Sequence, residues 1–254
     1  EQATLLRTAR FVSERDLGTF DEALGVAGQV QSELPPVAVE ATMAGEAFAL
    51  AGLGQFDIYA QGMLVLFIFM TTLTAGATIV QTRRLGVARR TFSTPTSVGT
   101  MIAGEALGRF ALAALQGSFI FVGTWLFFGV DWGDPLGSAV TVIVFAAVAS
   151  AAAMLLGAVA GNEQQASGLS WAVGIGGAAL GGCMFPLAVL EELSETVYQV
   201  AHVTPHAWAL EAFQTLVVDG GGLGDIVGYL GVLAGFAAVL FLLATWRLRV
   251  VLVR

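Results

Sequence analysis

Long uncharged stretches dominate the chain from residue 57 onward. Asp57 and Arg83 are separated by 25 uncharged residues, and four later gaps between charged residues are 21 to 28 residues long. A helix that crosses the hydrocarbon core of a bilayer needs about 20 such residues. The pattern therefore predicts an all-α integral membrane protein, with five transmembrane helices visible in the chain at about 58–82, 101–130, 137–160, 166–187 and 225–247.

Two further apolar stretches, at about 188–201 and 205–218, are amphipathic and too short to cross a bilayer. Segments of this length are expected to dip into the membrane or to lie in its interface. Thr204-Pro205 predicts the start of the second one, with Thr204 as N-cap and Pro205 at the first helical position. The ring of Trp208 suits such an interface. We therefore expect two short re-entrant or interfacial helices within 188–218.

Residues 1–56 predict a small extracellular helical region, separate from the transmembrane part, residues 57–254. Leu5, Ala9 and Val12 have helical spacing, and Thr19 could begin a capping box with Glu22. A solvated spacer and a region that contacts a substrate are both compatible with this pattern.

The arginines predict the orientation. The C-terminal tail carries Arg247, Arg249 and Arg254 without an acid, so the positive-inside rule predicts a cytoplasmic C-terminus. With five spans, residues 83–109 then lie on the same side, and eight of the 11 basic residues are cytoplasmic. Residues 1–57 fall outside a plasma membrane that the chain crosses several times. They contain no apolar signal, so we expect a preceding span or a cleaved signal to have carried them across.

Composition excludes several functions. The chain is 56% hydrophobic and 12% charged, too apolar for an ordinary soluble domain. It has no Lys, so it can hold neither a Walker A loop nor a Schiff-base active site. The net charge of −8 argues against nucleic-acid binding. Cys183 is the single cysteine, so no intrachain disulfide can form.

Candidate catalytic and metal sites are weak. His202 and His206 are four residues apart, but Pro205 breaks a helix between them and the chain has no third His to complete a site. We expect them to pack or to cap, and we expect no metal. Ser170 lacks the second Gly of a nucleophile elbow. The sequence therefore does not favour an enzyme.

Glu105 and Arg109 are the one acid–base pair close to a predicted span. Their i, i+4 spacing with the acid first suits an ion pair. Charges within a membrane are candidates for function, but this pair lies near the predicted cytoplasmic end, so a structural role is favoured. No acid lies at the centre of a predicted span, which argues against a carrier driven by protons or sodium.

The predicted cytoplasmic loop, residues 83–100, carries more than arginines. Leu85, Val87 and Phe92 could give a short helix an apolar face, and Thr94-Pro95 would end it. Apolar residues on an exposed helix indicate a partner surface. We favour a docking helix over a simple positive-inside anchor.

Two motifs resemble a known family. Arg84-Leu85-Gly86-Val87, then Arg89-Arg90 and Thr94-Pro95-Thr96-Ser97, resembles the cytoplasmic loop after the second span in ABC-2 type permeases, the membrane subunits of type-2 ABC exporters. Gly181-Gly182-Cys183-Met184-Phe185-Pro186-Leu187, followed by Thr204-Pro205-His206-Ala207-Trp208-Ala209, resembles the extracellular signature of that family. The similarity covers about residues 57–250.

The resemblance implies six spans, of which this chain lacks the first, and a dimer with an identical or different permease. It also implies two cytoplasmic ABC ATPase subunits that bind ATP and Mg²⁺, with no cofactor in this chain. It implies ATPase coupling by Arg83, Arg84, Leu85, Gly86, Arg89, Arg90, Phe92 and Pro95. It implies an outer gate or hairpin that includes Phe185, Pro186, Thr204, Pro205 and Trp208. Glu105 departs from the Lys that the family often has there.

The sequence hypothesis is thus a permease subunit of an ATP-driven exporter that performs no covalent chemistry. Its path would lie at the dimer interface, lined by the first and fourth visible spans. A secondary carrier, a membrane-embedded enzyme and a non-transporting membrane anchor are the alternatives. The family handles drugs, lipids, glycans and ions, and no residue here selects among them.

Overall fold

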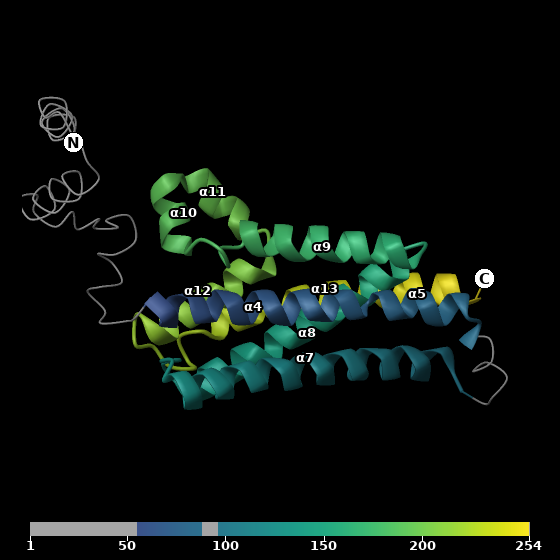
Figure 1. The fold of residues 1–254 in the computed structure, drawn as a ribbon, viewed down its shortest axis with the longest axis horizontal. Helices are drawn as coiled ribbons and strands as arrows, with labels where there is room; N and C mark the ends of the chain where they lie inside the picture. Colours follow the sequence, from purple (N-terminus) through teal and green to yellow (C-terminus); the bar gives the residue numbers. More distant parts are fainter. Residues whose placement is uncertain (1–54, 88–95, 254) are drawn as a thin grey trace, which may run out of the picture. The chain divides into compact units, whose positions relative to one another are not determined.

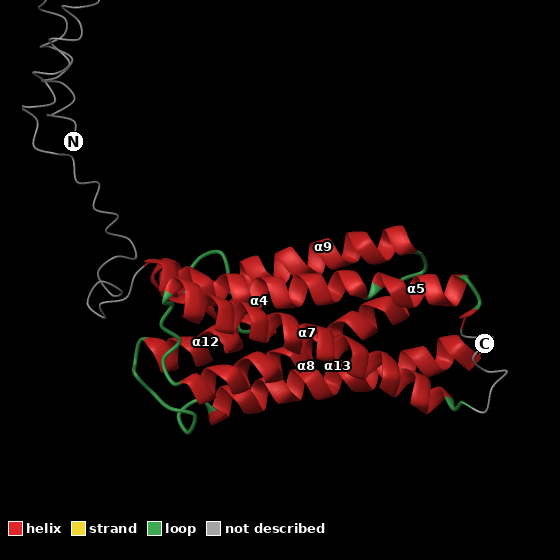
Figure 2. Ribbon diagram, turned by 60° about the horizontal axis from the view of Figure 1, so that its bottom comes forward, coloured by secondary structure: helices red, strands yellow, loops and turns green. Residues whose placement is uncertain are grey.

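The computed structural model describes residues 55–87 and 96–253, which all belong to one compact unit, residues 43–254. Every regular element in this part of the chain is a helix (Figure 2). The predicted all-α fold is therefore confirmed. The predicted outer region, residues 1–56, lies almost entirely outside the described residues, and its structure stays a prediction.

Four stretches of the described chain are long and apolar enough to cross a membrane. The first, Tyr59–Arg84, comprises most of α4 (Gln55–Ala75) and all of α5 (Ala77–Arg84). The others are α7 (Val98–Phe128), α8 (Pro135–Val159) and most of α13 (Val227–Val253). They coincide with four of the five spans that the charge gaps predict. These helices run along one another in the same bundle (Figure 1).

The remaining predicted span, 166–187, differs from the structure. Helix α9 runs over Glu163–Leu180, has 18 residues and is not among the four candidate spans. Its first turn is the polar Glu163-Gln164-Gln165, and the chain leaves the helix at Gly181-Gly182, where Gly182 has a φ of 89°. The polar turn and this early end leave α9 fewer apolar residues than the about 20 that a crossing needs. The described chain thus supports four spans, and the fifth is not confirmed.

Three short helices follow α9: α10 (Leu187–Leu193), α11 (Glu195–Ala201) and α12 (Pro205–Val217). The first of the two predicted short helices is divided at Ser194, whose backbone is extended (φ −170°, ψ 126°). Helix α12 begins at Pro205, where Thr204-Pro205 predicts its start. Helices α10 and α11 lie at the opposite end of the bundle from α5 (Figure 1).

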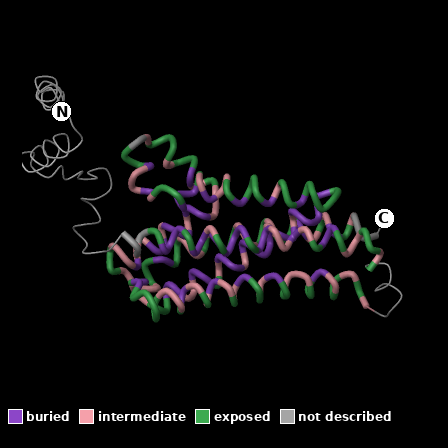
Figure 3. Tube along the Cα trace, in the orientation of Figure 1, coloured by how far each residue is buried: buried purple, intermediate pink, exposed green. Residues whose placement is uncertain are grey.

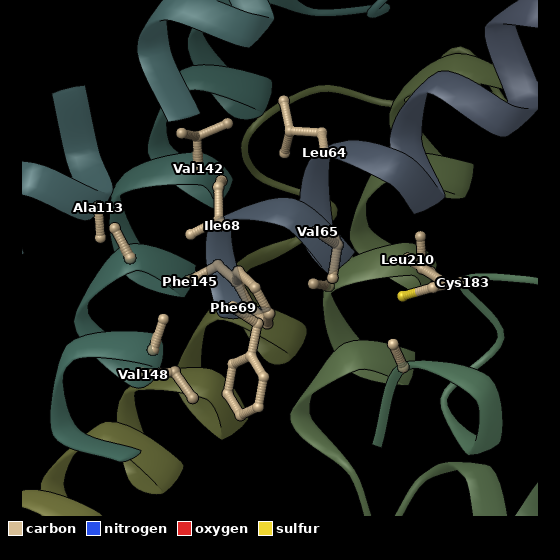
Figure 4. Close-up of a cluster of buried hydrophobic side chains, with 14 of the residues drawn as sticks. Leu64, Val65, Ile68, Phe69, Ala113, Val142, Phe145, Val148, Cys183 and Leu210 are labelled. Atoms are coloured by element: carbon tan, nitrogen blue, oxygen red, sulfur yellow. The ribbon is translucent and has the colours of Figure 1, made fainter. Parts of the chain in front are cut away.

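Helix α8 is the central element of the bundle. It is buried along most of its length, whereas α7 and α13 keep many apolar side chains exposed (Figure 3). Leu64, Ile68 and Phe69 of α4 meet Phe145 and Val148 of α8 in the main core (Figure 4). Exposed apolar faces are the expected arrangement where lipid, rather than water, surrounds a helix.

Glycines allow the closest helix contacts. A Cβ atom on Gly157 of α8 would lie 2.6 Å from the carbonyl oxygen of Gly76, between α4 and α5. A Cβ on Gly174 of α9 would lie 2.5 Å from the Met70 sulfur of α4. Small residues let membrane helices approach in this way. Gly174 therefore allows α9 to pack tightly against α4.

Candidate functional site

Arginines gather at one end of the bundle, where α5 ends, α7 begins and the C-terminal part of α13 lies (Figure 1). Arg83, in the last turn of α5, donates hydrogen bonds from Nη1 to the carbonyl of Gly157 (3.2 Å) and from Nη2 to that of Ala160 (3.4 Å). The last carbonyls of a helix lack partners within the helix. Arg83 therefore ties the end of α5 to the end of the central helix α8.

An exposed apolar turn follows directly. Leu85, the C-cap of α5, is 66% exposed, and Val87 is also exposed. Gly86 adopts a φ of 69°, a conformation that favours glycine, and its amide donates to the Arg83 carbonyl (3.2 Å). Arg84 is exposed beside this turn. The docking helix stays a prediction, because the other predicted coupling residues lie outside the described residues. These are Arg89, Arg90, Phe92 and Pro95.

The Glu105 and Arg109 side chains form an ion pair on α7, with Nη2 and Oε2 2.8 Å apart. The Arg109 guanidinium also donates to the Ala75 carbonyl (2.9 Å) and to the Thr78 hydroxyl (3.1 Å). Ala75 is the last residue of α4, and the Ile79 amide donates to Gly76 (3.1 Å), so among the described residues the Ala75 carbonyl accepts from side chains, the Thr78 hydroxyl (2.8 Å) and Arg109. Arg109 is thus more than an ion-pair partner: it supports the interruption between α4 and α5.

The predicted outer-gate residues are distributed around α10 and α12. Phe185 is exposed, and Pro186 immediately precedes α10. Thr204 stands at the N-cap of α12, but its hydroxyl donates to the Ala201 carbonyl (2.9 Å) and does not cap the helix. The N-cap hydrogen bond that the sequence predicts is therefore absent, because the preceding turn takes the hydroxyl.

A polar and aromatic cluster joins α11 to α12. The Tyr198 hydroxyl donates to Glu211 Oε1 (2.6 Å), which also lies 3.3 Å from Nε2 of His202. The Trp208 indole donates to the His202 carbonyl (2.8 Å), and the His202 ring lies against the rings of both Tyr198 and Trp208. Burial, together with the hydrogen bond to Glu211, raises the pKa of Tyr198. This cluster holds the two short helices together.

Sequence reasoning missed Glu211 as a partner of this cluster. Its position in α12, together with the predicted turn before Pro205, indicates only that α11 and α12 fold back on each other. Which side chains then meet depends on the register between the two helices. The available signal was the excess of polar and aromatic residues at 198–211, which suits an interface.

His206 has different surroundings from His202. It is 1% exposed and its ring makes edge contacts with Phe69 (4.4 Å between centroids) and Phe145 (5.7 Å). Neither ring nitrogen has a hydrogen-bond partner among the described residues. The described part of the chain contains no group of three His, Cys, Asp or Glu residues that could hold a metal ion.

The chain is similar to known membrane transport proteins. The model of the ABC-2 family transporter proteins matches residues 20–246. The linearmycin resistance permease protein LnrN of Bacillus subtilis (strain 168) is 25% identical over 182 residues, which are 72% of this chain and 46% of that protein. The chain thus spans less than half the length of this relative. No solved structure matches.

Proposed function

This chain belongs to the ABC-2 family of transporter proteins, and on that premise we propose that it is the membrane permease subunit of an ATP-driven exporter. The permease would pair with a second permease, identical or different. Two ABC ATPase subunits would bind ATP and Mg²⁺ and drive the transport. The relative whose name refers to linearmycin resistance supports export of a toxic compound.

The observation that carries this proposal is the exposed apolar turn at the arginine-rich end. Leu85 offers an apolar contact to a partner, and Arg83, two residues earlier, is bonded to the end of α8. A movement of a partner bound at Leu85 would therefore be passed to the central helix of the bundle. This is the mechanical connection that an external ATPase requires.

The positive-inside rule supports a cytoplasmic position for this end. Arg83 and Arg84 lie there in the last turn of α5, Arg109 lines a cavity with Arg83, and Arg247 of α13 lies near Arg83. The ATPase would then meet the turn at Leu85 from the cytoplasm. The helices α10 and α11, at the opposite end, would face outward and close the path.

The docking proposal is tested by Leu85→Asp in the tagged chain, purified from native membranes. We expect the wild-type chain to bring down a protein with a Walker A loop and Leu85→Asp to lose it, because a buried unpaired carboxylate opposes an apolar contact. Val203→Asp is the control, since Val203 is 73% exposed in the turn between α11 and α12. If Leu85→Asp brings down as much of the ATPase as Val203→Asp does, docking at Leu85 is refuted.

The orientation is tested separately by a Leu85→Cys variant in which Cys183, the only cysteine, is replaced by Ala. A membrane-impermeant maleimide should label Cys at position 85 in inside-out vesicles and not in intact cells. Labelling in intact cells would place the arginine-rich end outside and overturn the proposal.

A further inference from the structure

A cavity of about 460 Å³ lies at the arginine-rich end, between α5 and the first turns of α7. Typical small-molecule sites have volumes of about 300–1,000 Å³, and this cavity lies within that range. Its polar lining includes Thr82, Arg83 and Arg109, and its apolar lining includes Ile102, Leu112 and Leu248. Charged groups and apolar walls in one cavity suit a ligand that has both a charged head and an apolar tail.

Among the described residues, the lining of the cavity carries one more positive than negative charge. Its acid, Glu105, is already paired with Arg109. Within residues 55–87 and 96–253, Arg83 donates hydrogen bonds to main-chain carbonyls alone, and Arg247 lies close enough to repel it. Since a guanidinium has five N–H donors, two carbonyl bonds leave Arg83 free to donate to a further acceptor. An anion in the cavity would balance the charge of the Arg83 guanidinium and accept its remaining hydrogen bonds.

Arg109 also belongs to the lining of this cavity. Arg109 is 6% exposed, and its Nε has no hydrogen-bond partner among the described residues. A buried donor without a partner is costly. Arg83 still has unused N–H donors, and these favour an oxygen-rich anion such as a phosphate, which accepts several N–H bonds.

The cavity is also accessible from the lipid side. Leu112, which lines it, is 51% exposed, and it continues into the exposed apolar face of α7 at Leu115 and Phe119. A lipid could therefore enter sideways with its chain along α7 and its head at Arg83. Basic pockets between membrane helices bind anionic lipid head groups in this way.

We propose that this cavity binds the phosphate head of an anionic phospholipid from the leaflet at the arginine-rich end. The lipid would bridge α5 and α7 beside the exposed turn at Leu85. This inference does not depend on transport or on an ATPase, because it rests on the cavity and its charges alone.

The first test measures lipid retained by the purified full-length chain in native mass spectrometry. Phosphatidylglycerol is titrated against phosphatidylcholine, and inorganic phosphate is added as a competitor. We expect preferential retention of phosphatidylglycerol, and Arg83→Gln should weaken it about fivefold, which corresponds to one basic residue near an anionic lipid. Arg249→Gln is the matched control, because Arg249 is exposed on α13 at the same end and does not line the cavity.

A second pair of variants keeps every charge. A Cβ on Gly104, which lines the cavity, or on Gly123, farther along α7, would meet no heavy atom within 4 Å. Gly104→Leu should therefore fill the cavity without disturbing the helix and should lose phosphatidylglycerol, whereas Gly123→Leu should retain it.

Three results would overturn the proposal. One is equal retention of the two lipids by the wild-type chain. Another is equal phosphatidylglycerol binding by both members of either variant pair. The third is complete competition by inorganic phosphate, which would assign the site to a free anion. Because ATPase recovery is measured separately, failure here leaves the docking proposal intact.

Discussion

Replacing Arg109 by Met separates two roles that the sequence cannot distinguish. Methionine keeps an unbranched apolar stem in the buried position and removes the guanidinium. The loss comprises the ion pair with Glu105 and two hydrogen bonds, to the Ala75 carbonyl and the Thr78 hydroxyl. The last two hold the interruption between α4 and α5 against α7.

The size of the expected loss in unfolding free energy depends on how exposed the ion pair is. The Glu105 side chain is 42% exposed, so solvent screens the pair and its coupling should be about 0.5–1 kcal/mol. Hydrogen bonds between membrane helices contribute about 0.6 kcal/mol on average and up to about 1.7 kcal/mol. The Arg109→Met variant should therefore lose about 2–4 kcal/mol of unfolding free energy, and most of that loss should not depend on Glu105.

A double-mutant cycle with Glu105→Gln measures this division. The free energy of unfolding is obtained for the wild type, both single variants and the double variant, by titrating detergent-solubilised protein with dodecyl sulfate and following helix content. We expect Arg109→Met to remain costly in the Glu105→Gln background. If Arg109→Met costs nothing there, the ion pair accounts for the whole effect and the role at the helix interruption is refuted.

Three further substitutions test packing and hydrogen bonding. Gly157→Leu should lower the free energy of unfolding by about 1–3 kcal/mol in the same assay, because its Cβ would meet the Gly76 carbonyl at 2.6 Å. Gly231→Leu on α13, which has open space at its Cβ, should leave stability unchanged. Equal losses in the two variants would refute the close contact at Gly157. His206→Leu should change stability by less than about 1 kcal/mol, because lost ring contacts are offset by removal of an unpaired buried N–H. His202→Leu should lower the free energy of unfolding by about 1–2 kcal/mol, because the His202 ring is hydrogen-bonded to the Tyr198 main-chain carbonyl and lies beside Glu211. A larger loss of stability in His206→Leu than in His202→Leu would contradict this prediction.

Much of the fold follows from local pattern. The spans around α4, α7, α8 and α13 are predicted by uncharged length alone, because hydrocarbon accepts a helix only if few charges interrupt it. The same test overestimates α9. It counts uncharged residues, so it accepts Gln164 and Gln165 and does not detect the turn at Gly182.

The candidate site was predicted only in part. The i, i+4 spacing indicates that Glu105 and Arg109 can pair, since both lie on one helix. It cannot indicate that Arg109 also reaches Ala75 and Thr78, which lie 34 and 31 residues away in sequence. Likewise, the sequence of α9 does not indicate that Met70 is the neighbour of Gly174.

By itself, the sequence determined that the chain is helical and rich in membrane-spanning segments, that it lacks the Lys of a Walker A loop, and that its arginines cluster. These properties depend on residue type and on spacing within single helices. Only the tertiary structure decided that Arg83 bonds the end of α8, that Arg109 supports a break in another helix, and that both line one cavity. Those contacts depend on the register and separation of helices distant in sequence, which hydrophobic periodicity does not specify.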